Sequence, residues 1–192
     1  MHFGIDYGSK LAGTTVITYQ KDGVLFQISS QKKEDADKLI VAAVDEMGPD
    51  VIFIDAPLSL PGAYFGKGED YFYREADKTL GAMSPMFLGG LTARAMKLKR
   101  QITEKGARVF ETYPGALVRN TQNLKSVYDK KAKKVSDPLF EEIMELLNGV
   151  TLNKQPDNMH QVDSILAWHS GHRHLQGISK VVGNAEEGLI IY

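Results

Sequence analysis

The chain has 192 residues, a length that suits one domain (1–192) with a full hydrophobic core. Its 23 Lys and Arg residues nearly balance its 24 Asp and Glu residues, so bulk charge predicts neither nucleic-acid nor membrane binding. The absence of cysteine excludes disulfides, a thiolate nucleophile and a thiolate zinc site. No signal-peptide pattern and no apolar run of ~18 residues is present, so a cytoplasmic protein without a membrane partner is expected.

Three short strands are predicted at the start of the chain. His2–Asp6 is apolar and β-compatible, Lys10–Tyr19 is rich in Thr, Val and Ile, and Val24–Ser29 alternates between apolar and polar residues. Asp22-Gly23, between the last two, is a strong signal for a tight hairpin turn. The chain is therefore expected to open with a three-stranded meander.

A helix is predicted from about Glu34 to Met47, where apolar residues recur at helical spacing. Gly48-Pro49 is a typical end for such a helix. Val51–Ile54 then forms a continuous apolar run that ends at Asp55. This pattern is typical of a strand buried on both faces in the middle of a parallel sheet.

The regular pattern is interrupted between about residues 58 and 90. This segment contains two prolines, six glycines and a dense aromatic group: Tyr64, Phe65, Tyr71, Phe72, Tyr73 and Phe87. It is too aromatic for a disordered linker, and a long ordered loop in a compact domain is usually functional. We expect an inserted loop region here.

The remainder of the chain is predicted to hold a helix over 91–105, a strand over 107–112, a lysine-rich run over 125–134, helices over 137–147 and 158–175, and a short final strand over 189–192. Asp137-Pro138 is expected to form the N-cap and first turn of the first of the last two helices, and Asp157 or Asn158 to cap the second. The element order predicts an α/β protein with a mixed five-stranded sheet and helices on both faces.

Acidic residues end two of the predicted strands. Asp6 and Asp55 would lie on adjacent parallel strands about 4.8 Å apart, at the edge where open α/β sheets place their sites. Two carboxylates so close repel each other unless a cation lies between them or one is protonated. Mg²⁺ commonly binds one or two carboxylates, so a metal site is predicted.

Two further acids are candidates for this site. Asp163 lies on the apolar face of the last helix, where an ionised acid is seldom found without a partner. Small neighbours would let this helix approach the sheet closely: Ser164, Ala167, Ser170 and Gly171. Glu111 is near the end of the strand over 107–112. The alternatives are a turn or cap role for Asp55 and an ordinary salt bridge for Asp163.

The run Gly4-Ile5-Asp6-Tyr7-Gly8-Ser9 resembles the first-strand motif of the RNase H-like superfamily. More closely, the chain resembles an uncharacterised domain family of predicted nucleases with an RNase H-like fold. The matching segments cover most of the chain in order: Ile54-Asp55-Ala56-Pro57-Leu58, Arg74-Glu75-Ala76-Asp77, Ser84-Pro85-Met86-Phe87, Glu111-Thr112-Tyr113-Pro114-Gly115-Ala116, Val162-Asp163-Ser164-Ile165-Leu166-Ala167 and Glu186-Glu187-Gly188.

This resemblance implies a metal-dependent nuclease that hydrolyses phosphodiesters with Mg²⁺ or Mn²⁺. Asp6, Asp55 and Asp163 match acids on the first strand, the fourth strand and the last helix, which Holliday-junction resolvases of the superfamily use. The candidate catalytic residues are therefore these three acids and Glu111, which would bind or orient a second ion. The helix over 34–47 carries no obvious inward acid, so the four-acid arrangement of RNase H itself is not expected.

Five residues are candidates for substrate binding: Ser9, Lys10, Arg74, Asp77 and Tyr113. Gly8-Ser9-Lys10 also resembles the phosphate-binding turn of actin- and sugar-kinase-like ATPases, although it lacks P-loop spacing. Arg74 and Asp77 are either a surface ion pair or, for Arg74, a bidentate contact to phosphate. Tyr113 lies in a segment that matches the family.

Other features leave the function open. The lysine-rich run over 125–134 is either a phosphate-facing surface or a solvated face. A deep pocket under the inserted loop would favour a different enzyme, one acting on small-molecule or nucleotide phosphates. Acids too far apart to share an ion would favour a non-catalytic domain that binds nucleic acid or protein.

Overall fold

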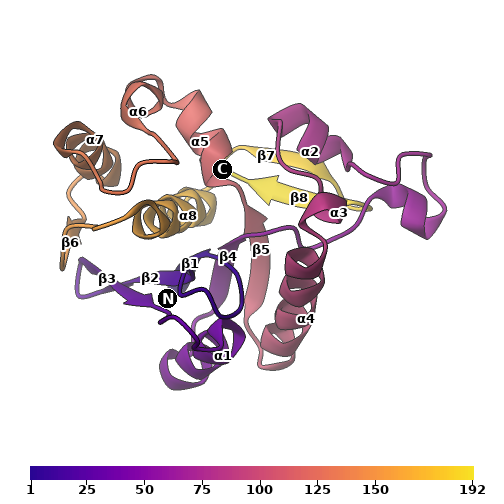
Figure 1. Ribbon diagram of the computed structural model, residues 1–192, viewed down its shortest axis with the longest axis horizontal. Coiled ribbons are helices and arrows are strands. Elements are labelled where there is room, and N and C mark those ends of the chain that lie inside the picture. Colours follow the sequence, from indigo (N-terminus) through magenta and orange to yellow (C-terminus); the bar gives the residue numbers. More distant parts are fainter.

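The computed structural model describes residues 1–192 and contains one eight-stranded mixed sheet in the order β6-β3-β2-β1-β4-β5-β8-β7 (Figure 1). The strands are β1 (His2–Asp6), β2 (Val16–Lys21), β3 (Val24–Ser29), β4 (Val51–Asp55), β5 (Arg108–Thr112), β6 (Thr151–Leu152), β7 (Val181–Asn184) and β8 (Gly188–Ile191). Strand β1 runs antiparallel to β2 and parallel to β4, and β4 runs parallel to β5. Five of the six predicted strands thus form the centre of the sheet.

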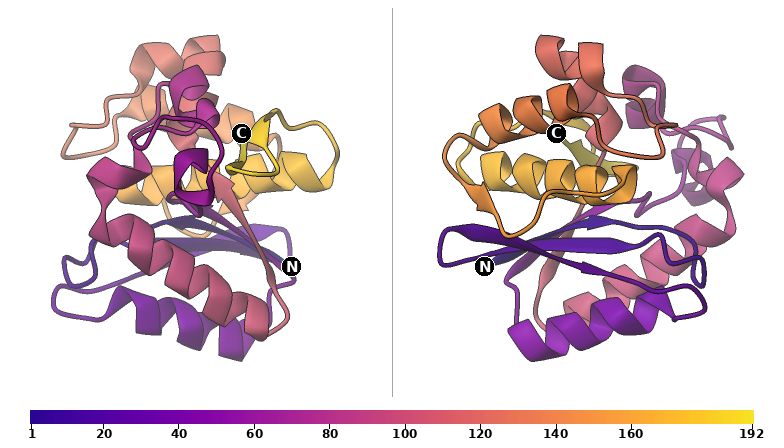
Figure 2. Two further views of the ribbon diagram at one scale, coloured as in Figure 1. Left: turned by 90° about the vertical axis from the view of Figure 1, so that its right-hand side faces the viewer. Right: turned by 60° about the vertical axis from the view of Figure 1, so that its left-hand side comes forward.

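The helices are η1 (Gly62–Phe65), a 3₁₀ turn, and α1 (Ala36–Met47), α2 (Glu75–Leu80), α3 (Pro85–Leu88), α4 (Gly90–Glu104), α5 (Pro114–Asn120), α6 (Gln122–Val127), α7 (Asp137–Leu147) and α8 (Met159–Leu175). Helices α1 and α4 cover one face of the sheet (Figure 2). Helix α8 covers the other face, and α5, α6 and α7 lie outside it. None of the helices combines the length and apolar character needed to cross a bilayer.

Local sequence signals explain the ends of the main elements. Asp22 and Gly23 both have positive φ, 51° and 81°, as the predicted tight turn between β2 and β3 requires. Gly48 has left-handed geometry and ends α1. Asn158 caps α8 by accepting a hydrogen bond from the backbone N–H of Gln161. Ser136, rather than Asp137, caps α7.

Three expectations about the elements need correction. Strand β2 begins at Val16 rather than near Lys10, because residues 10–13 form a turn in which Gly13 has a φ of 74°. The predicted loop over 58–90 contains the short helices η1, α2 and α3. The sheet has eight strands rather than five. Strand β8 matches the expected final strand, whereas β6 and β7 have only two and four residues and carry little sequence signal.

Two glycines allow α8 to lie directly on the sheet. A Cβ on Gly4 of β1 would lie 2.1 Å from the backbone nitrogen of Trp168, and one on Gly171 would lie 2.1 Å from the Phe53 ring. No larger residue fits at either place without moving backbone or ring atoms. The close approach predicted from the small residues of this helix is therefore confirmed, and it determines how near Asp163 comes to the strands.

Candidate functional site

Asp6 and Asp55 face each other across two adjacent parallel strands. In the register of β1 and β4 they are direct Cα partners, and each is the last residue of its strand. Strands in a sheet lie about 4.8 Å apart, so the pairing alone brings two carboxylates to one edge. Asp6 is buried, and Asp55 is half-buried.

Helix α8 brings a third acid to the same edge. It runs antiparallel to β1, since Trp168 stacks on His2 at the start of the strand and His160 meets Asp6 at its end. Asp163 lies one turn after His160, on the buried face of the helix, with 2% of its surface exposed. The three acids expected to converge are therefore close enough to affect one another's ionisation.

Positively charged and hydrogen-bonding groups surround two of the three acids. The His160 ring nitrogen Nδ1 lies 2.7 Å from an Asp6 oxygen. The Tyr128 hydroxyl donates a hydrogen bond of 2.7 Å to Asp163, and the Lys130 ammonium lies 4.0 Å from the same carboxylate. Asp55 has no hydrogen-bonding or ion-pairing group of its own.

The electrostatics of the cluster follow from burial and mutual repulsion. Burial, and then the charges of Asp6 and Asp163, hold the pKa of Asp55 well above its ordinary value. Burial and the charge of Asp6 raise the pKa of Asp163 to about 6. Burial also raises the pKa of Asp6, against the opposing effect of His160. Burial would lower the pKa of Lys130, but the three carboxylates raise it. Negative charge therefore exceeds positive charge at this edge of the sheet.

The donor chemistry of this edge fits a hard divalent cation, because all three acids are oxygen donors and Asp55 is without a partner. The side chains as they stand do not form a coordination shell: no group of three or more His, Asp or Glu residues is arranged to hold a metal ion. Asp6 and Asp163 are instead directed toward His160 and Tyr128. Side-chain rotation would have to accompany metal binding.

A cavity of about 710 Å³ opens over the acidic edge. Its lining includes five carboxylates but only one lysine, Lys130, and no arginine. Apolar and aromatic side chains of the inserted segment, residues 58–90, form part of its wall, including Phe87 and Leu88. The site is therefore a pocket with an acidic end and an apolar wall, not an open basic groove.

Arg74 forms a buried clamp behind this pocket. Its side chain is fully buried, and all five of its N–H donors are used by Asp77, Glu111 and Ser59. The interpretation as a surface ion pair is wrong, and no donor remains for a substrate phosphate. Arg74 and Asp77 instead hold α2 against the end of β5.

Glu111 belongs to the same clamp rather than to the acid cluster. Both of its carboxylate oxygens accept hydrogen bonds from Arg74, and one also accepts from the Leu58 backbone N–H. The predicted role in binding or orienting a second ion is therefore not what this geometry favours. Its fixed position holds the start of the inserted segment on the edge of the sheet.

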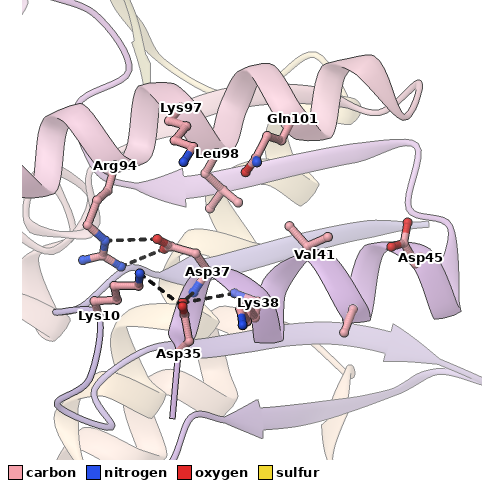
Figure 3. Close-up of a pocket in the computed structure, with 11 residues that line it drawn as sticks. Lys10, Asp35, Asp37, Lys38, Val41, Asp45, Arg94, Lys97, Leu98 and Gln101 are labelled. Atoms are coloured by element: carbon pink, nitrogen blue, oxygen red, sulfur yellow. Dashed lines mark hydrogen bonds and ion pairs between the residues drawn. The ribbon is translucent and has the colours of Figure 1, made fainter. Parts of the chain in front are cut away.

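Ser9 and Lys10 lie away from the acidic pocket. Ser9 is exposed in the turn after β1, and Lys10 lines a separate cavity of about 440 Å³ between α1 and α4 (Figure 3). There the Lys10 ammonium lies 3.2 Å from Asp35, while Arg94 binds Asp37 through two nitrogens. Neither residue reaches the acids, because the turn directs the chain toward α1.

Tyr113 does line the acidic pocket, at the start of α5, with the Arg119 guanidinium 5.1 Å from its ring centre. Two residues that contact the acids, His160 and Tyr128, were not predicted. His160 precedes Asp163 by three residues, a helical spacing that indicates a shared face. Tyr128 lies in an irregular segment, where no local pattern indicates which way a side chain points.

The central strand order β3-β2-β1-β4-β5, with only β2 antiparallel to its neighbours and helices on both faces, defines an α/β protein of RNase H-like fold. No protein-family model and no curated protein matches the chain, so membership of the uncharacterised family stays a prediction. Among solved structures, RuvC of Thermus thermophilus in complex with a Holliday junction substrate is similar, with 14% identity and a TM-score of 0.47. Another T. thermophilus RuvC structure has 13% identity and a TM-score of 0.45. Each match covers 92% of this chain and 96% of RuvC.

Proposed function

We propose that this protein is a metal-dependent phosphodiester hydrolase in which Asp6, Asp55 and Asp163 bind Mg²⁺ or Mn²⁺. The observation that carries the proposal is the register of β1 and β4, which places Asp6 directly beside Asp55 with Asp163 close by. Retaining three mutually repelling carboxylates in one pocket is costly unless a cation is bound between them.

Different residues of the chain would have different roles in such a site. A divalent ion bound by the three acids would supply Lewis-acid polarisation of the phosphoryl group and activation of water. Lys130 is largely exposed at the mouth of the pocket, where its ammonium attracts a phosphate oxygen. His160 and Tyr128 hold Asp6 and Asp163 through hydrogen bonds, and they would have to release these carboxylates for an ion to be bound.

A second candidate function is supported by the shape of the site. A cavity of about 710 Å³ is within the size range of small-molecule sites. Its single lysine suits one phosphate group better than a long nucleic acid, which is usually bound by many cations. An enzyme acting on small-molecule or nucleotide phosphates at the same acids is therefore the alternative.

The decisive experiment is a Mn²⁺ soak of crystals with anomalous diffraction, combined with hydrolysis assays of the full chain. We expect a Mn²⁺ ion in contact with Asp6 and Asp55, and hydrolysis of a phosphodiester that EDTA abolishes. Asp55→Asn should lose both properties. Asp157→Asn, which alters an exposed acid on the loop before α8, is the matched control.

The result separates the candidates. Hydrolysis of oligonucleotides supports the phosphodiesterase, whereas turnover of only mononucleotide or sugar phosphates supports the second candidate. A protein that binds no Mn²⁺ at these acids and hydrolyses none of these substrates would contradict both.

A further inference from the structure

The acidic pocket has an apolar wall that the proposed chemistry does not require. Side chains of the inserted segment and of α4 form it together with Tyr113: Tyr73, Met83, Phe87, Leu88 and Leu91. Phe87 is 63% exposed and Met83 is 59% exposed. Single exposed apolar residues are ordinary on protein surfaces, but here several line one cavity next to a cluster of acids.

Phe87 is the most exposed ring in this wall, and neighbouring rings hold it in place. The Tyr73 ring meets it nearly at right angles with centres 5.7 Å apart, and the Phe72 ring lies 5.8 Å away. Ser84 caps α3 and fixes the backbone of the turn that carries Phe87. The wall therefore presents a positioned aromatic surface rather than a collapsed cluster.

A ligand for this pocket needs two chemically different parts. One part must suit the acids and Lys130, as a phosphate with its metal ion does. The other must be flat and weakly polar to lie against Phe87 and the neighbouring aliphatic side chains. A nucleotide combines both parts, and bases stack readily on aromatic side chains once they are unstacked from their neighbours.

We propose that the wall around Phe87 binds one unstacked nucleobase, so that the substrate is a single-stranded nucleic acid. This inference rests on the proposed function, because the acids define where the phosphate lies. A base paired inside a duplex cannot enter the pocket without leaving its stack.

The test measures binding separately from hydrolysis. The probe is a labelled homopolymeric single strand of DNA, compared with an abasic strand of the same length and with the duplex, by fluorescence anisotropy. The full chain carries Asp55→Asn throughout, which blocks the proposed hydrolysis and removes one negative charge. We expect removal of the bases to weaken binding about tenfold. The duplex should bind at least as weakly as the abasic strand.

A comparison of variants assigns this effect to the wall. With Phe87→Ala added, removal of the bases should cost almost nothing further. Phe65→Ala is the matched control: Phe65 is an exposed ring on the same inserted segment, outside the pocket, so the tenfold cost should remain. Equal base dependence in both variants, or equal binding of duplex and single strand, would overturn the inference.

The two proposals fail in different ways. If base-dependent binding through Phe87 is found but the wild-type chain hydrolyses no phosphodiester, the base site stands and the proposed function falls. If single strands are hydrolysed at the same rate by wild type and Phe87→Ala, and binding shows no base dependence, the base site falls and the hydrolase stands.

Discussion

Asp6 and Asp55 are direct register partners on two parallel strands, and no backbone element separates their carboxylates. Each residue is the last of its strand, so both side chains lie where the chain leaves the sheet. The pairing depends on hydrogen bonding between β1 and β4 and not on either side chain. The sheet thereby brings together two carboxylates that repel each other, and the groups around them determine how far their pKa values shift.

Asp55→Asn is expected to raise the free energy of unfolding in EDTA at about pH 7. An ionised Asp55 is buried beside Asp6 and Asp163, which repel it, and it has no hydrogen-bonding partner; keeping it protonated instead also costs free energy, so a neutral amide relieves the cost in either form. Urea unfolding measures the change. In the proposed hydrolase the same variant should lose activity by about 100- to 1,000-fold.

The control for this variant is Asp50→Asn. The Asp50 carboxylate lies 2.5 Å from the N-terminal ammonium, which lowers its pKa, so this substitution should leave stability unchanged or reduced. An Asp55→Asn variant that unfolds at a lower urea concentration than the wild type would contradict the repulsion described for the site.

Gly4→Ala is expected to destabilise the protein by about 1–3 kcal/mol, because the new methyl group would meet the backbone of α8 at Trp168. The helix must shift, and Asp163 shifts with it, so the proposed activity should fall as well. Trp168 is the only tryptophan, and its fluorescence reports the change directly. Gly90→Ala, where no atom lies within 4 Å of the added carbon, should be close to neutral.

Arg74→Met is expected to cost about 3–5 kcal/mol, because it leaves Asp77 and Glu111 buried without their cation. Adding Glu111→Gln to this variant should recover part of the loss, since one uncompensated charge is then gone. Urea unfolding of the single and double variants measures the coupling. Arg100→Met, at an exposed pair with Glu104, should change stability by less than about 1 kcal/mol.

His169 should make stability depend on pH. Burial, and then the charges of Arg173 and His172, lower its pKa to about 4, whereas histidine in the unfolded chain titrates near 6.5. The unfolded state therefore binds an extra proton below about pH 6.5, and the stability due to neutral His169 is lost as the pH falls toward 4.

The measurement is urea unfolding of the wild type and of His169→Gln. From about pH 7 to about pH 4.5, the free energy of unfolding of the wild type should fall by about 2 kcal/mol more than that of His169→Gln. Comparing the two proteins cancels the contribution of the acid cluster. The raised pKa values of those acids stabilise the folded state as the pH falls, which is opposite to the effect of His169. A difference that does not vary with pH would show that His169 is not held neutral.

Much of the fold follows from local patterns. Periodicity, caps and turn residues predict α1, α4, α7 and α8 and the five central strands, because these elements carry their signals within a few residues. The short helices of the inserted segment escape prediction because tertiary contacts hold them. Glu187 shows this: its side chain accepts hydrogen bonds from the backbone N–H groups of Gly62 and Glu75.

The candidate site was likewise predictable only in part. Its three acids are predictable, since each lies at the end of a clear strand or on the apolar face of a clear helix. The roles of Arg74 and Glu111 are not predictable in this way. The sequence pattern of an arginine close to an acid is the same whether the pair is exposed or buried. Burial of the Arg74 side chain identifies the clamp.

The amino-acid sequence by itself determined the order of the main elements and the acids at the ends of β1 and β4 and on the apolar face of α8, since these depend on local periodicity and strand ends. Only the tertiary structure decided that Glu111 is bound by Arg74, that His160 and Tyr128 hold two of the acids, and that Phe87 faces the same pocket. These relationships join residues up to 154 positions apart, and their geometry depends on how helix, insertion and sheet pack together.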